Sequence, residues 1–152
     1  KAVRWNPKFR GAFIGFTLSH QRGHVARSIM EGIAYLCREI IESYENSGLN
    51  IGEVRVYGGA SRSRVWCKIK ASVWGKKVLV LEEKNTAVLG AASLCGLGLK
   101  IFHDAREAVE RFVKIEEEIY PDEGWVKIYD KCYKKYLRLC SLLEKFYSSD
   151  NG

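Results

Sequence analysis

The stretch from Val54 to Ser63, which reads Val-Arg-Val-Tyr-Gly-Gly-Ala-Ser-Arg-Ser, decides the fold of this chain. Its first half has the alternation and β-branched residues of a strand, two glycines follow, and the serines lead into a helical pattern. Adjacent glycines let the backbone approach a ligand with no Cβ in the way. A helix start offers unpaired N–H groups and the positive end of the helix dipole. The segment therefore suits a nucleotide or phosphate group.

The glycine turn alone leaves two interpretations open. It lacks the Lys-Ser/Thr of a P-loop and does not have the GxGxxG spacing. Ser61 and Ser63 could cap the helix or bond a ligand, so a plain αβ turn with a serine cap competes with a nucleotide site.

The segments on either side of the turn alternate between strand and helix patterns. Residues 12–17 predict a short strand, and the apolar positions after His24 recur at helical spacing over about 22 residues, up to Gly48. They are Val25, Ile29, Ile33, Leu36, Ile40 and Tyr44. After the turn, Val65, Ile69 and Val73 predict a helix that stops at Gly75. Residues 78–81 predict a strand buried on both faces, and residues 86–97 a helix rich in Ala and Gly. Residues 1–100 thus read β-α-β-α-β-α, an α/β core with a predominantly parallel sheet.

Residues 101–152 predict a helical C-terminal extension of the same domain. Asp104 and Glu107 form a capping box before a helix, and Glu116-Glu117-Glu118 is interpreted as a solvated helix end. A last helix over about residues 124–147 places several residues on one face. They are Tyr129, Tyr133, Tyr136, Cys140 and Leu143.

The length, composition and net charge of the chain limit the number of domains and the kinds of partner. At 152 residues and 47% hydrophobic, the chain suits one domain, residues 1–152, rather than two. The net charge of +7 is uneven, with +9 over residues 1–100 and −2 over residues 101–152. A basic front portion suggests a nucleotide, a nucleic acid or an acidic protein as partner, or simply a solvated basic surface. No apolar run reaches the roughly 20 residues of a membrane helix.

The five cysteines, with no CxxC pair, argue against a disulfide framework and a structural zinc site. We expect them to be small buried apolar residues in a reducing cytoplasm. His20 and His24 could share a helix face as metal ligands, but no third ligand lies at a useful spacing, so no metal site is predicted. Trp66 and Trp74 are interpreted as core residues.

A basic cluster lies beside the glycine turn. It comprises Arg62, Arg64, Lys68 and Lys70. The cluster could touch phosphates or nucleic acid, but a solvated helix face is the preferred interpretation.

Three segments together resemble a known family. Gly11-Ala-Phe-Ile-Gly15-Phe with His24-Val25 and Ser28-Ile29-Met30-Glu31 resembles the C-terminal signature of the FGGY carbohydrate kinases. Gly58-Gly59-Ala60-Ser61-Arg62-Ser63, followed by Trp66, resembles that family's adenosine-binding motif. Val88-Leu89-Gly90-Ala91-Ala92 is similar to its Ala-Leu-Gly-Ala-Ala helix. Tyr120-Pro121-Asp122 and the tyrosine face resemble the close of xylulokinase-type members.

The resemblance implies a partial actin-like ATPase (ribonuclease H-like) fold. It also implies ATP-dependent phosphorylation of a hydroxyl group of a sugar, xylulose, with magnesium as the metal ion. It implies cofactor-binding roles for the turn: Gly59 packs its backbone against the nucleotide, Ser63 contacts adenosine, and Gly58, Ala60 and Ser61 shape the turn. Ala60 stands where many members have a third glycine, and Asn85 where an acidic residue often occurs.

By position, the chain corresponds to the second part of the family's C-terminal domain. The sugar-binding domain, the phosphate-binding loop, the magnesium site and the catalytic Asp would lie in a missing portion. The only aspartates are Asp104, Asp122, Asp130 and Asp150, so residues 1–100 hold no candidate Asp base. We expect the chain alone to be inactive, to be cytoplasmic, and to self-associate through an exposed sheet edge or apolar surface. A basic nucleic-acid-binding module and a non-catalytic structural remnant are the alternatives.

Overall fold

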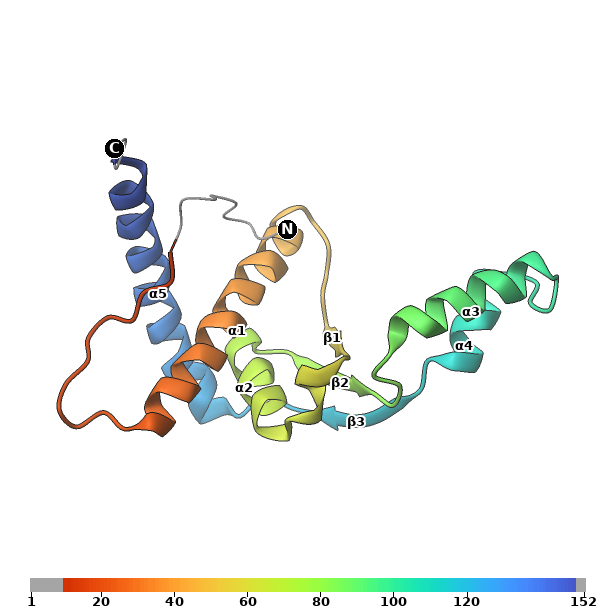
Figure 1. Cartoon of the computed structure of the whole chain (residues 1–152), viewed down its shortest axis with the longest axis horizontal. Coiled ribbons are helices and arrows are strands. Elements are labelled where there is room, and N and C mark those ends of the chain that lie inside the picture. The colour runs from red at the N-terminus through yellow and green to blue at the C-terminus, as the bar shows by residue number, and fades with distance from the viewer. Residues whose placement is uncertain (1–9, 150–152) are drawn as a thin grey trace.

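The computed structural model describes residues 10–149. Their elements run α1 (Arg22–Asn46), β1 (Glu53–Val56), the 3-10 helix η1 (Gly59–Arg62), α2 (Arg64–Trp74), β2 (Lys77–Leu81), α3 (Thr86–Gly98), α4 (Ala105–Phe112), β3 (Ile115–Ile119) and α5 (Glu123–Ser149). Helices α1, α2 and α5 gather at one end of the molecule, and α3 with α4 extends from the other (Figure 1). Among the described residues, no helix combines the length and apolar character needed to cross a membrane.

The sheet has three strands in the order β1-β2-β3. Strand β2 pairs parallel to β1 and antiparallel to β3. Its Val78, Leu79, Val80 and Leu81 are all buried, as their unbroken apolar run predicts. The α/β class is confirmed, and the parallel arrangement holds for one of the two strand pairs.

The glutamate run lies in strand β3, so its interpretation as a helix end is wrong and residues 101–152 are not purely helical. The apolar strand β2 needs a partner on its second edge, and Ile115 and Ile119 pair there with Leu81 and Val78. Basic side chains meet the intervening glutamates: Arg64 Nη2 lies 2.8 Å from Glu117, Lys77 lies 3.4 Å from Glu118, and Lys84 pairs with Glu116. These ion pairs offset the negative charge that the three glutamates bring to the strand.

The strand predicted over residues 12–17 is absent, and that prediction is wrong. Gly11 to Phe16 are exposed and lie in no helix or strand. A strand persists only when its backbone groups pair with a neighbour. Within the described residues nothing lies alongside this segment to pair with it, so it loops out beside α1 and α5 (Figure 1).

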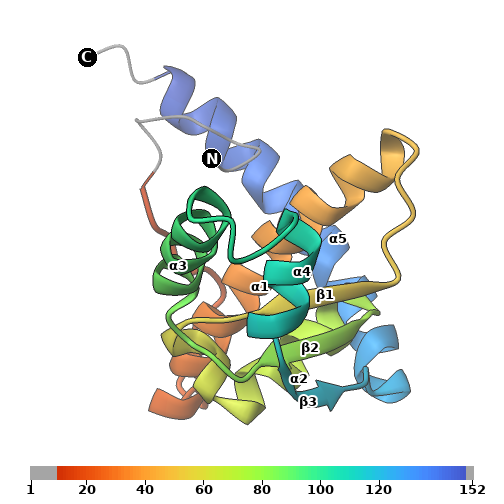
Figure 2. The same cartoon turned by 90° about the vertical axis from the view of Figure 1, so that its right-hand side faces the viewer.

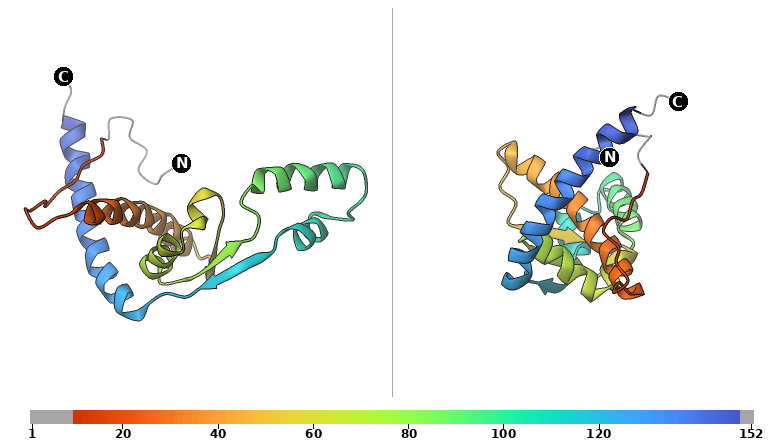
Figure 3. Two further views of the ribbon diagram at one scale, coloured as in Figure 1. Left: turned by 60° about the horizontal axis from the view of Figure 1, so that its bottom comes forward. Right: turned by 90° about the vertical axis from the view of Figure 1, so that its left-hand side faces the viewer.

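Helix α2 lies between the sheet and α1, with α5 packed on α1 and α2 (Figure 3). Its apolar face buries Cys67, Ile69 and Val73. The Trp74 indole N–H donates to the Ala34 carbonyl at 2.9 Å, and the Trp66 indole N–H donates to the Met30 carbonyl at 3.4 Å. The two tryptophans therefore join α2 to α1, which confirms their structural interpretation.

An aromatic seam holds α1 to α5. The Tyr35 ring lies 6.2, 5.9 and 5.3 Å from those of Tyr129, Tyr133 and Tyr136, centroid to centroid. Rings at these spacings gain from edge and offset contacts beyond the area they bury. The predicted tyrosine face of the last helix is thus a core face.

Helices α3 and α4 pair with each other rather than with the sheet (Figure 2). A Cβ at Gly96 would lie 2.4 Å from the Phe102 ring, so this close approach requires glycine. Asp104 caps α4 by accepting the Glu107 N–H at 2.9 Å, as predicted. The buried-cysteine prediction holds for Cys67 but is wrong for Cys95 on α3, which is exposed.

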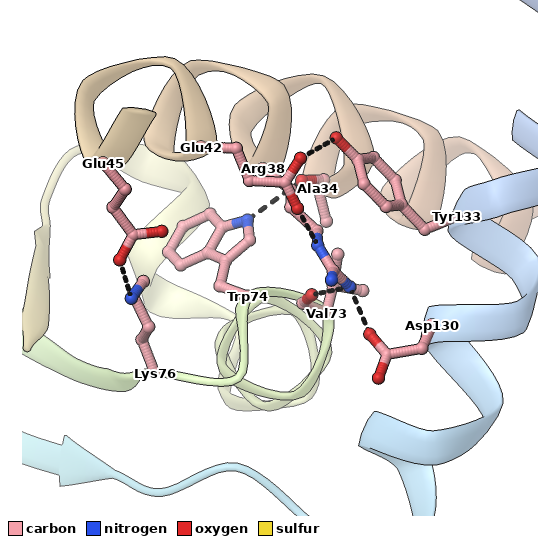
Figure 4. A network of polar contacts seen from close by, with 9 residues as sticks. All are labelled: Ala34, Arg38, Glu42, Glu45, Val73, Trp74, Lys76, Asp130 and Tyr133. Atoms are coloured by element: carbon pink, nitrogen blue, oxygen red, sulfur yellow. Dashed lines mark hydrogen bonds and ion pairs between the residues drawn. The ribbon is translucent and has the colours of Figure 1, made fainter. Parts of the chain in front are cut away.

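A polar network around Arg38 ties the three helices together (Figure 4). The guanidinium donates to Glu42 at 2.9 Å, to the Val73 carbonyl at 3.0 Å and to Asp130 at 2.7 Å. The hydrogen bonds to both carboxylates hold the pKa of Arg38 above its ordinary value against the effect of burial. One side chain therefore joins α1 to both α2 and α5.

We expect Arg38→Met to lower the free energy of unfolding by about 1–3 kcal/mol, because it strips the partners from partly buried acceptors. Urea denaturation measures the change. Arg55→Met is the matched control, since Arg55 is half exposed and 3.9 Å from Glu53, and it should change stability by less than about 0.5 kcal/mol. Equal effects of the two changes would contradict the role of the network.

Candidate site at the glycine turn

The glycine turn follows β1 at the edge of the sheet where β1 and β2, being parallel, both end. Ligands of open α/β sheets bind at this carboxyl edge. Gly58 has φ 79° and ψ −172°, a conformation essentially restricted to glycine. The backbone therefore turns sharply away from the strand at a residue that no other type could replace without strain.

Gly59 begins the short helix η1 and faces open space. A Cβ built there would meet no atom within 4 Å, and its φ is not positive. Among residues 10–149, neither packing nor backbone conformation demands glycine at this position. The open face above Gly59 leaves room for a flat or bulky group to rest on the backbone.

Ser61 shapes the turn from inside. It is buried, and its hydroxyl donates to the Gly58 carbonyl at 2.8 Å, with its N–H on the same oxygen at 3.1 Å. The Cys67 thiol lies beneath and donates to the Ser61 carbonyl at 3.5 Å. These contacts engage the Ser61 hydroxyl within the protein.

Ser63 caps α2. Its Oγ accepts the Trp66 N–H at 3.3 Å, which confirms the serine-cap interpretation. A hydroxyl that accepts one bond still has its own O–H to donate, so the cap and a ligand contact are compatible. The two interpretations left open by the sequence are not exclusive at this residue.

The basic cluster beside the turn is mostly engaged within the protein. Lys68 donates to the Tyr120 carbonyl at 3.1 Å, and Arg64 pairs with Glu117. Lys70 is buried, with its ammonium 4.5 Å from the centre of the Trp66 ring, so its interpretation as part of a solvated face is wrong. The four-residue spacing of Trp66 and Lys70 could have indicated this contact.

The loop after β2 reaches the same edge of the sheet. Asn85, at the N-cap of α3, is exposed and makes no side-chain cap hydrogen bond. Its N–H donates to the Glu83 carboxylate at 2.6 Å. Glu83 thus brings an acidic group to the loop where Asn85 replaces the residue that the resemblance implies.

The described aspartates have structural roles. Asp104 caps α4, Asp122 accepts the Trp125 N–H at 3.0 Å, and Asp130 pairs with Arg38, whereas Asp150 lies outside the described residues. His20 and His24 accept backbone N–H groups of Thr17 and Gln21 through Nδ1. Over residues 10–149, no three His, Cys, Asp or Glu side chains gather as a metal site. The described residues therefore supply no complete set of metal ligands of their own.

Comparisons with known proteins give one consistent family. A model of the C-terminal domain of the FGGY family of carbohydrate kinases matches residues 1–99. The xylulose kinase of Bacillus subtilis is 31% identical over 127 residues, which cover 84% of this chain and 26% of that protein. A glycerol kinase of Saccharolobus islandicus is 33% identical over 121 residues, covering 79% of this chain and 24% of that protein.

A crystal structure of a xylulose kinase from Rhodospirillum rubrum superimposes with a TM-score of 0.82 at 29% identity. The match covers 94% of this chain and 29% of that one. The chain thus spans about a quarter of the length of the curated relatives it matches. The neighbours confirm the expected partial α/β domain of actin-like ATPase type. The matched residues include the glycine turn and the signature segments. This chain therefore belongs to the FGGY family of carbohydrate kinases.

Proposed function

We propose that this chain supplies the adenosine side of the ATP site of a sugar kinase. The observation that carries the proposal is the turn at the carboxyl edge of the sheet, which has a glycine-only conformation at Gly58 and is open at Gly59. Gly59 and Ala60 would lie against the nucleoside, and the Ser63 hydroxyl would donate to it. Bound ATP would supply the phosphoryl group that the reaction transfers.

The catalytic base is proposed to come from outside these 152 residues. Each described aspartate caps a helix or pairs with Arg38, and we assign none of them as the base. Magnesium would likewise be held elsewhere, and we derive no step through it. The chain contributes binding and orientation of the nucleotide, which are major parts of phosphoryl-transfer catalysis.

Xylulose is the proposed sugar of the whole kinase. The support is the xylulose kinase from Bacillus subtilis together with the xylulose kinase structure from Rhodospirillum rubrum. A cytoplasmic location follows from this assignment as part of the proposal. Nucleic acid is the less favoured partner, because Lys68, Lys70 and Arg64 of the basic cluster already have partners within the chain.

We expect no ADP release when the chain alone is incubated with ATP and xylulose. A chimera in which this chain replaces its counterpart in the Bacillus subtilis xylulose kinase should phosphorylate xylulose. In that chimera, Gly59→Val should raise the KM for ATP at least tenfold and leave the KM for xylulose unchanged. Turnover by the chain alone, or a selective rise in the KM for xylulose, would contradict the proposal.

A further inference from the structure

The outer face of α5 carries a row of five basic side chains, which we call the basic stripe. Lys127, Lys131, Lys134, Arg138 and Lys145 are all exposed and follow one another at spacings of 4, 3, 4 and 7 residues. Because these spacings are close to whole turns of a helix, the five side chains lie on one side of α5, over about 27 Å of its length. The C-terminal half of α5 extends away from the sheet and from α2 (Figure 1).

The charges of the basic stripe are not neutralised by neighbouring carboxylates. Over residues 10–149, none of its five side chains makes an ion pair or a hydrogen bond. Two acidic residues, Asp130 and Glu144, lie between the ends of the stripe. Asp130 pairs with Arg38 at 2.7 Å, and Glu144 is partly buried. Unlike the basic cluster beside the glycine turn, the stripe is therefore a continuous band of positive charge that favours an anionic partner.

Large aliphatic side chains adjoin the basic stripe. Ile128 is 58% exposed and Leu142 is 55% exposed, and their positions in the helix place both along the same flank of the stripe. A helix face that combines lysines with exposed aliphatic side chains is typical of helices that lie in the interface of a membrane. A nucleic acid would use the cations, but its phosphate backbone gains nothing from isoleucine and leucine. The combination therefore favours a lipid surface.

The basic stripe is distinct from a groove of about 680 Å³ that lies around Tyr35, between α1 and α5. On α5 that groove is lined by Cys132, Lys135, Tyr136 and Leu139, none of which belongs to the stripe. The two surfaces thus use different residues of α5, and the stripe needs no occupant in the groove.

We propose that the basic stripe of α5 binds the surface of an anionic lipid membrane. Its lysine and arginine head groups contact the lipid phosphates, while Ile128 and Leu142 enter the boundary between the head groups and the acyl chains. Each cation near such a surface strengthens binding roughly fivefold, so five together give a reversible peripheral attachment. The glycine turn contributes no residue to this surface, so the inference goes beyond the proposed nucleotide site and does not rest on it.

The test is co-sedimentation of the chain with vesicles that mix phosphatidylcholine and phosphatidylglycerol. Binding should fall steeply as salt is added, because salt screens the charges, and should be much weaker to vesicles of phosphatidylcholine alone. Lys131→Glu combined with Arg138→Glu should weaken binding at least about thirtyfold. Arg106→Glu combined with Arg111→Glu is the matched control, because these exposed arginines of α4 lie at the other end of the molecule and change the net charge equally. The control should bind within about threefold of the parent chain.

Leu142→Ser should weaken vesicle binding about tenfold, because it removes a side chain that enters the lipid. Leu94→Ser on α3 is its control: Leu94 is 72% exposed and lies away from the stripe, so binding should not change. The inference is overturned if the chain does not bind the mixed vesicles, or if the two double variants act alike. It is also overturned if duplex DNA is bound more tightly than the vesicles and Leu142→Ser has no effect, a result that would identify nucleic acid as the partner.

Discussion

Gly59→Val should lower the affinity of the chain for ADP at least about a hundredfold and leave the free energy of unfolding nearly unchanged. The reason is that the Gly59 Cβ direction is empty, so a valine there meets nothing in the protein but enters the space where the nucleoside is proposed to lie. Isothermal titration calorimetry measures the affinity, and urea denaturation the stability.

Gly52→Val is the matched control for this change. Gly52 is also exposed, has no positive φ and has nothing within 4 Å of its Cβ direction, but it lies before β1 at the other end of the strand. It should bind ADP like the parent chain. Gly58→Ala is a poorer probe, because it strains the backbone and would cost about 1–3 kcal/mol of stability as well. If the Gly59→Val variant binds ADP as tightly as the parent chain, the assignment of the nucleotide site to the glycine turn is wrong.

Alkaline pH should destabilise the fold steeply, because it ionises tyrosines that the fold keeps neutral. Burial raises the pKa of Tyr129 to about 12, and burial is also the main cause of the raised pKa of Tyr35, Tyr133 and Tyr136. Below the unfolded pKa of about 10 both states keep these protons and the stability is fully present. Above it only the unfolded state releases them, so stability is lost as the pH rises toward the folded values.

Above a pH of about 10, each such tyrosine lowers the free energy of unfolding by about 1.4 kcal/mol per pH unit, so the four together give a slope of about 5 kcal/mol per pH unit. Urea denaturation at pH about 9 and about 11 measures this slope. Tyr35→Phe should be nearly neutral at the lower pH, since the phenol oxygen has no hydrogen-bond partner among the described residues. At the higher pH the variant should be more stable than the parent by about 1 kcal/mol. A flat profile would contradict the burial of the seam.

The elements that were predictable from the sequence are those with a clear period and a clear stop signal. Helix α1 shows its apolar spacing over many turns, and α2 ends at Gly75 in the left-handed conformation, as a terminal glycine predicts. The buried strand β2 is evident from its unbroken apolar run. Local chemistry is enough for these elements because each carries its own pattern.

The failures concern segments whose structure depends on a distant partner. Glu116-Glu117-Glu118 forms a strand because β2 and the side chains of Arg64, Lys77 and Lys84 lie beside it. Residues 12–17 have a strand composition but no strand to pair with among the described residues. Pairing of this kind is long-range and leaves no periodic signal in either segment.

The candidate site divides in the same way. The need for glycine at Gly58 and the cap at Ser63 follow from local rules, and the structure has both. The buried Ser61, the Cys67 thiol beneath it and the buried Lys70 depend on how α2 packs under the turn. The groove around Tyr35 is lined by residues of α1 and α5 that lie about a hundred positions apart in the sequence, so no motif could have indicated it.

The central claim is that the Gly58–Ser63 turn receives the adenosine of a nucleotide. The most direct measurement is a titration of the isotope-labelled chain with ADP, followed by amide chemical shifts. We expect the largest shifts at Gly59, Ala60 and Ser63, with the amides of Gly11–Phe16 unchanged. Shifts concentrated elsewhere, or no shift of the turn at saturating ADP, would contradict the account.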